Sequence, residues 1–168
     1  MGSHGSGSGD VRAIMDGFRH VVRALRVSAR AAEKRAGMSG AQLFVLQKLG
    51  EASPLSIGEL ARRTATDQSS VSVVVSRLAR QKLVDRTPDP RDGRRILVRP
   101  TTRGRAMVRG SPEPAQNRLL DALGNLSPST RRSLARSLAT LVGEMKLTSP
   151  PPMFFEDEPS RSRRRVRS

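Results

Sequence analysis

Apolar residues recur at helical spacing along most of the chain. Between residues 10 and 37, apolar side chains return every three or four positions, and arginines occupy many of the positions between them. This pattern is typical of a long amphipathic helix, for which Asp10 is a suitable N-cap and Gly37 a suitable stop. The apolar stripe of this helix consists of Val11, Ile14, Met15, Phe18, Val21, Val22 and Leu25.

Capping boxes mark the starts of the next two helices. Ser39 with Gln42, and Ser56 with Glu59, have the required spacing. We expect the first of these helices to end before Pro54 and the second to be short.

A third helix is predicted after a turn at residues 64–66, with Asp67 as its N-cap. Its buried face is predicted from apolar residues at the spacing i, i+3, i+4, i+7, namely Val71, Val74, Val75 and Leu78. The opposite face carries small polar side chains and arginines, which suits a helix that enters the major groove of DNA.

Individual side chains on that face match particular DNA groups. Gln68 can form paired hydrogen bonds with adenine, Val73 can touch a thymine methyl group, and Arg77 and Arg80 suit phosphate or guanine. The candidate DNA contacts of this helix are Gln68, Ser69, Ser70, Ser72, Val73, Ser76, Arg77 and Arg80. Taken alone, a serine-rich helix face is usually an ordinary solvated surface.

Two short strands are predicted at residues 83–87 and 95–99, joined by a turn-rich loop at residues 88–94. A basic hairpin directly after a helix that enters the major groove, here called the reading helix, indicates a winged helix-turn-helix. Residues 55–110 contain 13 Lys and Arg against 5 Asp and Glu, so positive charge is concentrated where DNA contact is predicted. The candidate DNA contacts of the hairpin are Arg86, Arg91, Asp92, Arg94 and Arg95.

The C-terminal part is predicted to be helical with one interruption. Thr102 can cap a helix, Pro112 and Pro114 should break it, and Ser127 before Pro128 indicates a new helix start. The last helix has an apolar stripe formed by Leu134, Leu138, Leu141, Val142 and Met145. One small domain cannot cover this stripe together with that of the first helix, so we expect a dimer.

Composition excludes several classes of function. The 168 residues have a formal net charge of +16, which favours a polyanionic partner such as nucleic acid. Absence of cysteine excludes disulfides and thiol redox switches, and His4 and His20 are too few and too far apart for a metal site or a catalytic triad. We therefore expect no catalytic residue, no metal and no cofactor. No apolar run is long enough to span a membrane and no export signal is recognisable, so a cytoplasmic protein is expected.

Both ends of the chain differ in composition from the middle. Residues 1–9 are rich in Gly and Ser and are expected to form a disordered arm or a tag remnant. Residues 149–168 contain three consecutive prolines, a short acidic stretch and an arginine-rich end, which predicts a disordered basic tail.

Several short motifs together resemble the MarR family of bacterial transcriptional regulators. The most specific is the Asp-x-Arg-Asp-x-Arg pattern of residues 89–94 in the predicted wing. The other motifs are Ile57-Gly58-Glu59-Leu60-Ala61, Gln68-Ser69-Ser70-Val71-Ser72, Arg77-Leu78 and Leu83-Val84-Asp85-Arg86. The likeness covers residues 10–148.

The resemblance implies a mainly α fold with a small β-hairpin wing, in the α+β class. It assigns residues 39–100 to the DNA-binding core and residues 10–37 and 102–148 to dimerisation. The implied function is that of a homodimeric repressor bound to a pseudo-palindromic operator in double-stranded DNA. Asp92 would fix the wing through a salt bridge, and Arg94 or Arg95 would enter the minor groove.

The chain departs from the family pattern at two places. Lys82 stands where a glycine usually precedes the first wing strand, so the turn into the wing is expected to differ. Pro112 and Pro114 interrupt what is normally one long helix, which puts the spacing between the two protomers' DNA-binding cores in question.

The resemblance also implies a pocket for a small aromatic or anionic effector between the dimerisation helices and the DNA-binding core. Candidate lining residues are Met15, Phe18, His20, Phe44 and Met107. For these residues, a role in the core or the dimer interface is favoured over a role in a pocket. An architectural DNA-binding protein with little sequence preference remains the alternative to a sequence-specific regulator.

Overall fold

The first helix, α1 (Gly5–Ala36), begins five residues before the predicted start. The computed structural model describes residues 5–149, 153 and 154, so part of the predicted N-terminal arm lies outside it. The prediction of disorder was wrong for Gly5–Gly9, which continue the helix. Adding a residue to an existing helix requires no new nucleation, so the amphipathic stretch can extend even into a glycine-rich segment.

The next three helices form a helix-turn-helix with the predicted caps. They are α2 (Gly40–Glu51), α3 (Ile57–Thr64) and α4 (Gln68–Arg80). Ser39 and Ser56 form complete capping boxes, and the Asp67 side chain accepts a hydrogen bond from the Ser70 N–H. These interactions fix the start of each helix, which in turn fixes the face that each presents to the core.

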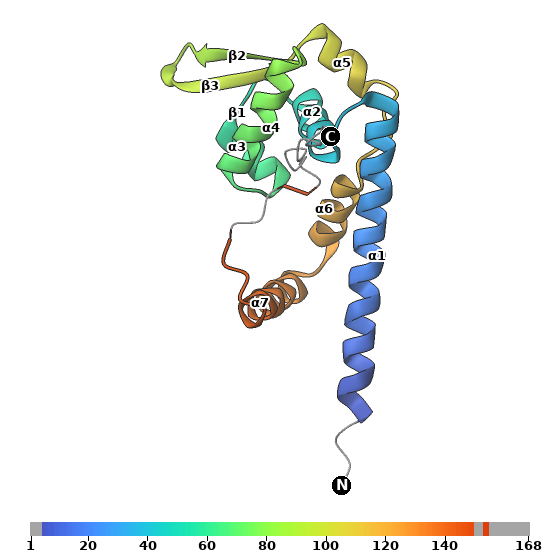
Figure 1. Cartoon of the computed structure of the whole chain (residues 1–168). Coiled ribbons are helices and arrows are strands. Elements are labelled where there is room, and N and C mark those ends of the chain that lie inside the picture. The colour runs from blue at the N-terminus through green and yellow to red at the C-terminus, as the bar shows by residue number, and fades with distance from the viewer. Residues whose placement is uncertain (1–4, 150–152, 155–168) are drawn as a thin grey trace, which may run out of the picture.

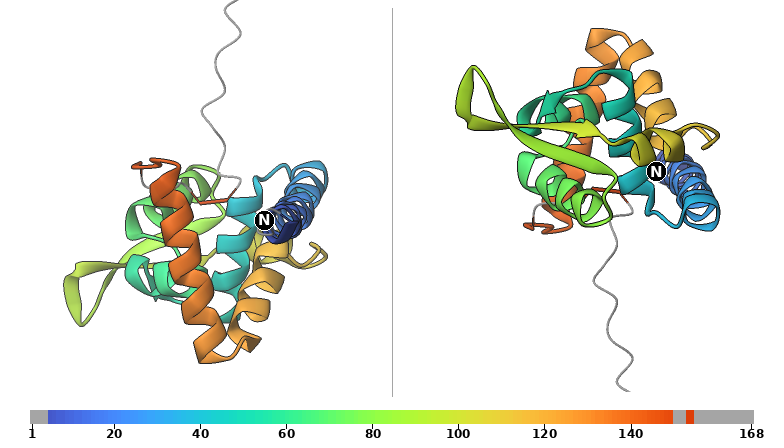
Figure 2. Two further views of the ribbon diagram at one scale, coloured as in Figure 1. Left: turned by 90° about the horizontal axis from the view of Figure 1, so that it is seen from below. Right: turned by 90° about the horizontal axis from the view of Figure 1, so that it is seen from above.

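A three-stranded antiparallel sheet in the order β1-β3-β2 forms the wing and its base. The hairpin strands β2 (Val84–Asp89) and β3 (Asp92–Pro100) are longer than predicted, which leaves a short tip. Strand β1 (Leu55–Ser56) was not predicted, because two residues overlapping a capping box show no alternating pattern. In both views of Figure 2, the hairpin projects from the side of the molecule opposite α1.

The hydrophobic core lies between α2, α3, α4 and the base of the wing. Val71, Val74, Val75 and Leu78 are fully buried, as their spacing predicted. From α2, the core receives Leu43, Phe44, Val45, Leu46 and Leu49. This packing holds α4 with its remaining face outward.

Three helices complete the fold: α5 (Thr102–Val108), α6 (Ala115–Asn125) and α7 (Pro128–Glu144). Thr101, not Thr102, caps α5, through a hydrogen bond from the Gly104 N–H at 3.0 Å. The predicted break at the two prolines is confirmed, since α5 ends before them and α6 begins after them. Helix α6 lies beside α1, where the Ala115 N–H donates to the Ser28 hydroxyl at 3.0 Å.

Much of the apolar surface of the terminal helices is uncovered. Helix α7 has no buried residue, and α1 extends far beyond the other helices (Figure 1). The expected apolar stripes of both helices are therefore present but largely unpartnered within one chain.

The C-terminal segment was predicted to be disordered throughout, and this was wrong for Met153. Its side chain is 4% exposed and belongs to the same core cluster as Phe44. Met153 follows three prolines and lies in a segment without helical or strand spacing of apolar residues, so only the tertiary structure reveals the contact. Residues 150–152 and 155–168, including the arginine-rich end, lie outside the described residues.

Candidate nucleic-acid interface

The outward face of α4 carries most of the predicted reading residues. Gln68, Ser69 and Arg80 are exposed, and Val73 is 44% exposed. Half-buried positions on this helix are Ser70, Ser72, Ser76 and Arg77. The structure thus brings all eight residues onto one helix, with Arg77 less accessible than the sequence suggested.

A network around Asp67 organises the start of α4. The Asp67 carboxylate accepts hydrogen bonds from the Ser70 N–H at 2.9 Å, from the Ser70 hydroxyl at 2.8 Å and from the Ser69 hydroxyl. These donors, led by the Ser69 hydroxyl, hold the pKa of Asp67 well below its usual range. Ser69 and Ser70 therefore fix the helix start as well as presenting small side chains to DNA.

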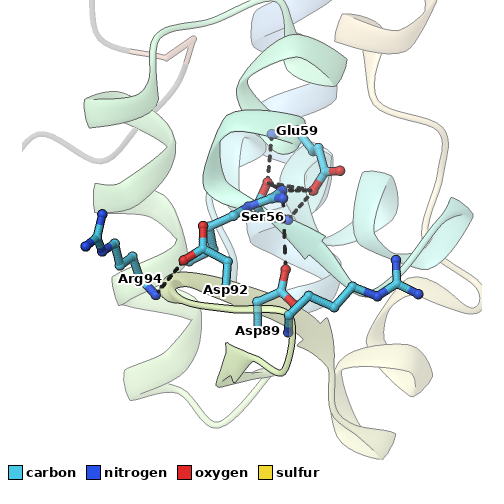
Figure 3. A network of polar contacts seen from close by, with 7 residues as sticks. Ser56, Glu59, Asp89, Asp92 and Arg94 are labelled. Carbon is cyan, nitrogen blue, oxygen red and sulfur yellow. Dashed lines mark hydrogen bonds and ion pairs between the residues drawn. The ribbon is translucent and has the colours of Figure 1, made fainter.

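The tip of the wing is shaped by two aspartates that bind backbone N–H groups. Asp89 accepts from the Arg91 N–H at 2.9 Å, and Asp92 accepts from the Arg94 N–H at 3.1 Å. Figure 3 shows the Arg94 side chain pointing away from this turn. Arg91 and Arg94 are both exposed, as a wing that enters a groove requires.

Arg95 behaves differently from its neighbour. Its guanidinium donates to the Ser56 hydroxyl at 3.2 Å and lies 3.5 Å from the Glu59 carboxylate and 4.0 Å from the Asp89 carboxylate. Arg95 thus ties the wing to the start of α3, whereas Arg94 remains the better placed of the two for the minor groove. The sequence suggested neither Ser56 nor Glu59 as a partner, because both lie 36 or more positions away.

The expected salt bridge of Asp92 is not found among the ion pairs of the described residues. Asp92 lies at the hairpin tip, where its carboxylate reaches the backbone two residues ahead and closes the turn. The carboxylates near Arg95 come from Asp89 and Glu59 instead. Among the described residues, the ion pairs of the wing are therefore formed by Arg95 with Glu59 and Asp89, and by Arg99 with Asp85.

Glu59 takes part in both the helix cap and this ion pair. Its carboxylate accepts from the Ser56 hydroxyl at 2.6 Å and from the Ser56 N–H at 2.7 Å. These two hydrogen bonds lower the pKa of Glu59 from its ordinary value, and the charges of Arg95 and Arg62 lower it further.

The predicted effector residues do not gather at one place in the single chain. Phe44 is buried and lines a cavity of about 930 Å³ beside α3 and α6. Met107 packs half-buried against the core. Met15, Phe18 and His20 lie on the exposed part of α1, so their membership in a pocket stays a prediction.

Other classes of site find no support in the part of the chain that the structure describes. That part contains no group of three or more acidic, His or Cys side chains able to hold a metal ion. It also contains no helix of the length and apolar character that a membrane span needs.

Comparison with known proteins identifies the family. A family model described as the MarR family matches residues 36–95. An uncharacterized HTH-type transcriptional regulator from Mycobacterium leprae is 31% identical over 141 residues, which cover 84% of this chain and 97% of the relative. The chain belongs to the MarR family. This MarR-family protein is accordingly a DNA-binding, HTH-type transcriptional regulator and not an enzyme.

Solved structures of similar proteins share the fold. A mutant MarR from E. coli, complexed with operator DNA, has a TM-score of 0.53 at 22% identity, covering 77% of this chain and 96% of the other. BpsR from Bordetella bronchiseptica, described as regulated in DNA binding by 6-hydroxynicotinic acid, has a TM-score of 0.50 at 28% identity, covering 74% and 91%. The mainly helical fold with a wing, expected from the sequence, is confirmed.

Proposed function

We propose that this MarR-family regulator acts in the cytoplasm as a homodimeric repressor that binds a pseudo-palindromic operator in double-stranded DNA. The observation that carries the proposal is the outward face of α4, small and polar, next to a wing whose tip presents Arg91 and Arg94. A helix of this kind fits the major groove, and an arginine at a hairpin tip fits the adjacent minor groove.

Dimerisation is supported by the uncovered apolar stripes. On α1, Val11, Ile14, Met15, Phe18, Val21 and Val22 are all exposed, and on α7 the same holds for Leu134, Leu138, Leu141, Val142 and Met145. Exposed apolar patches of this extent mark association surfaces. Two copies joined through them would present two α4 helices to two half-sites.

Release by an effector is supported by the cavity that Phe44 lines. Its volume of about 930 Å³ is in the range of small-molecule sites. Arg62 also lines it, which suits the small aromatic or anionic effector that the sequence suggested. We propose this cavity, which lies between the DNA-binding helices and α6, as the effector site.

Selection of bound fragments from random DNA tests the proposal. We expect enrichment of one motif with two inverted halves, and tighter binding of that motif than of random DNA at the same salt concentration. If every sequence is bound equally, the protein is an architectural DNA-binding protein instead.

The wing is tested with a charge-matched pair of variants. Arg94→Ala should weaken operator binding about tenfold and reduce the salt slope by about one, because one cationic contact is lost. Arg132→Ala removes the same charge from α7, away from α4 and the wing, and should leave both quantities nearly unchanged. Equal effects of the two variants would show that the wing acts only through net charge.

A further inference from the structure

The C-terminal segment Met153–Phe154 forms one wall of the cavity that Phe44 lines. Met153 is buried in the core cluster, and Phe154 lies at the cavity edge with 56% of its surface exposed. In Figure 1 this segment is the short red piece of chain between α3 and α6. Although close to the end of the sequence, the segment is thus built into the fold beside the DNA-binding helices.

The remaining walls come from α2, α3, the turn before α4, the start of α4, and α6, and most of the surface that lines the cavity is apolar. The apolar side chains of these walls are Phe44, Ala61, Ala65, Leu119, Leu120 and Leu123, and the polar ones are Arg62, Thr64, Thr66, Asp67, Gln68 and Gln116. Met153 and Phe154 cover one side of this cavity, which remains partly open to solvent. A small molecule buries enough surface for tight binding only when walls surround it on most sides.

One buried polar group lines the cavity from α6. Gln116 is 4% exposed, and its Nε2 has no hydrogen-bond partner among the described residues. A buried amide donor without a partner is energetically unfavourable, so a ligand that accepts its hydrogen bond gains affinity. The Nε2 amide group is a hydrogen-bond donor, so a ligand carbonyl oxygen within its reach can accept this hydrogen bond.

We propose that Met153 and Phe154 are binding residues of this cavity, and that it takes a small apolar molecule carrying one carbonyl acceptor, bound by Gln116. The proposal rests on the effector site of the proposed function and extends it to the C-terminal segment and to the chemical class of ligand. Asp67 and Gln68 line the same cavity, so such a ligand lies against the start of α4.

A fluorescent probe of the stated chemistry tests the proposal on the full-length protein. Prodan is a small, uncharged naphthalene with one ketone, and the +16 charge of the protein does not attract it. We expect saturable binding with a blue-shifted emission, and at least tenfold weaker binding to the Met153→Ser/Phe154→Ser variant. No saturable binding to the parent protein, or equal binding to the variant, overturns the proposal.

A matched control and a milder variant separate the wall from general destabilisation. Leu147 is 56% exposed, as Phe154 is, and does not line the cavity. Leu147→Ser should therefore bind the probe as the parent protein does. Phe154→Ser alone leaves the buried Met153 in place, so the midpoint of thermal unfolding should be retained. Binding of the probe should still be at least threefold weaker than to the parent protein. Unchanged binding contradicts the proposal.

The role of Gln116 is tested by a second probe. Gln116→Leu should weaken Prodan binding about fivefold, yet not weaken binding of N-phenyl-1-naphthylamine, which is apolar and lacks a carbonyl. Equal losses for both probes would refute the assigned hydrogen bond. None of these measurements uses DNA, so a protein without operator preference can still confirm the cavity wall, and an operator-specific protein can still refute it.

Discussion

Gly104 in α5 packs against the protein backbone more closely than any other residue could. A Cβ atom at this position would lie 2.1 Å from the Leu83 carbonyl oxygen and 3.4 Å from the Leu46 Cδ1 atom. The Leu83 oxygen accepts hydrogen bonds from the Thr101 N–H at 3.0 Å and the Thr101 hydroxyl at 3.3 Å. Moving that oxygen away from a new methyl group would therefore disturb the link between the wing and α5.

The expected effect of Gly104→Ala follows from three contributions. Overpacking at a backbone contact destabilises by roughly 1–3 kcal/mol, and a weakened hydrogen bond by about 1 kcal/mol. The higher helix propensity of alanine offsets about 1 kcal/mol. We expect a net loss of about 2 kcal/mol, which in a protein of this size lowers the midpoint of thermal unfolding by about 4–8 °C.

The measurement is thermal unfolding followed by circular dichroism at one fixed protein concentration, since dimer stability depends on concentration. Gly17→Ala provides the control, because Gly17 lies inside α1 and nothing lies within 4 Å of its would-be Cβ atom. The control should match or exceed the stability of the parent protein. If Gly104→Ala is as stable as the control, the close approach to Leu83 is refuted.

Three further predictions concern the turn into the wing, acid stability and assembly. Lys82 has a left-handed backbone with φ of 57°, so Lys82→Gly should stabilise the protein by about 1 kcal/mol in urea unfolding; a loss of stability would contradict this. The lowered pKa of Glu59 contributes stability above the unfolded value near 4.5 that is lost as pH falls. Glu59→Gln should thus be less stable than the parent at pH 7, the difference should shrink as the pH falls below 4.5, and a constant difference would disprove the assignment. Leu138→Glu, on the exposed face of α7, should convert a dimer to a monomer in light scattering, and an intact dimer would exclude this face from the interface.

Local signals in the sequence were sufficient for most elements of the DNA-binding core. The caps at Ser39, Ser56 and Asp67 and the apolar spacing of α4 depend on residues within seven positions of one another. Their physical basis is local hydrogen bonding and burial of one helix face, so they can be predicted from neighbouring residues without information on distant contacts. The same holds for the proline break between α5 and α6.

Side-chain pairing at the wing was decided by the tertiary structure. Two adjacent arginines, Arg94 and Arg95, are equivalent in the sequence, and both are exposed, yet Arg95 is bound to Ser56 and Glu59. Alternation along a strand sends neighbouring side chains to opposite faces, and only the packing of β3 against β1 and α3 determines which face meets the carboxylates.

The cavity and its C-terminal wall were likewise beyond the reach of the sequence. Phe44 was a candidate from its apolar character, whereas Met153, Phe154 and Gln116 showed no pattern that could place them near it. Periodicity describes one element at a time, but a cavity forms where segments distant in the chain fail to fill the space between them. The sequence by itself determined the helix predicted to enter the major groove, the wing and the family. The tertiary structure decided which arginine binds the Glu59 and Asp89 carboxylates and which residues surround the cavity, because both depend on contacts between residues far apart in sequence.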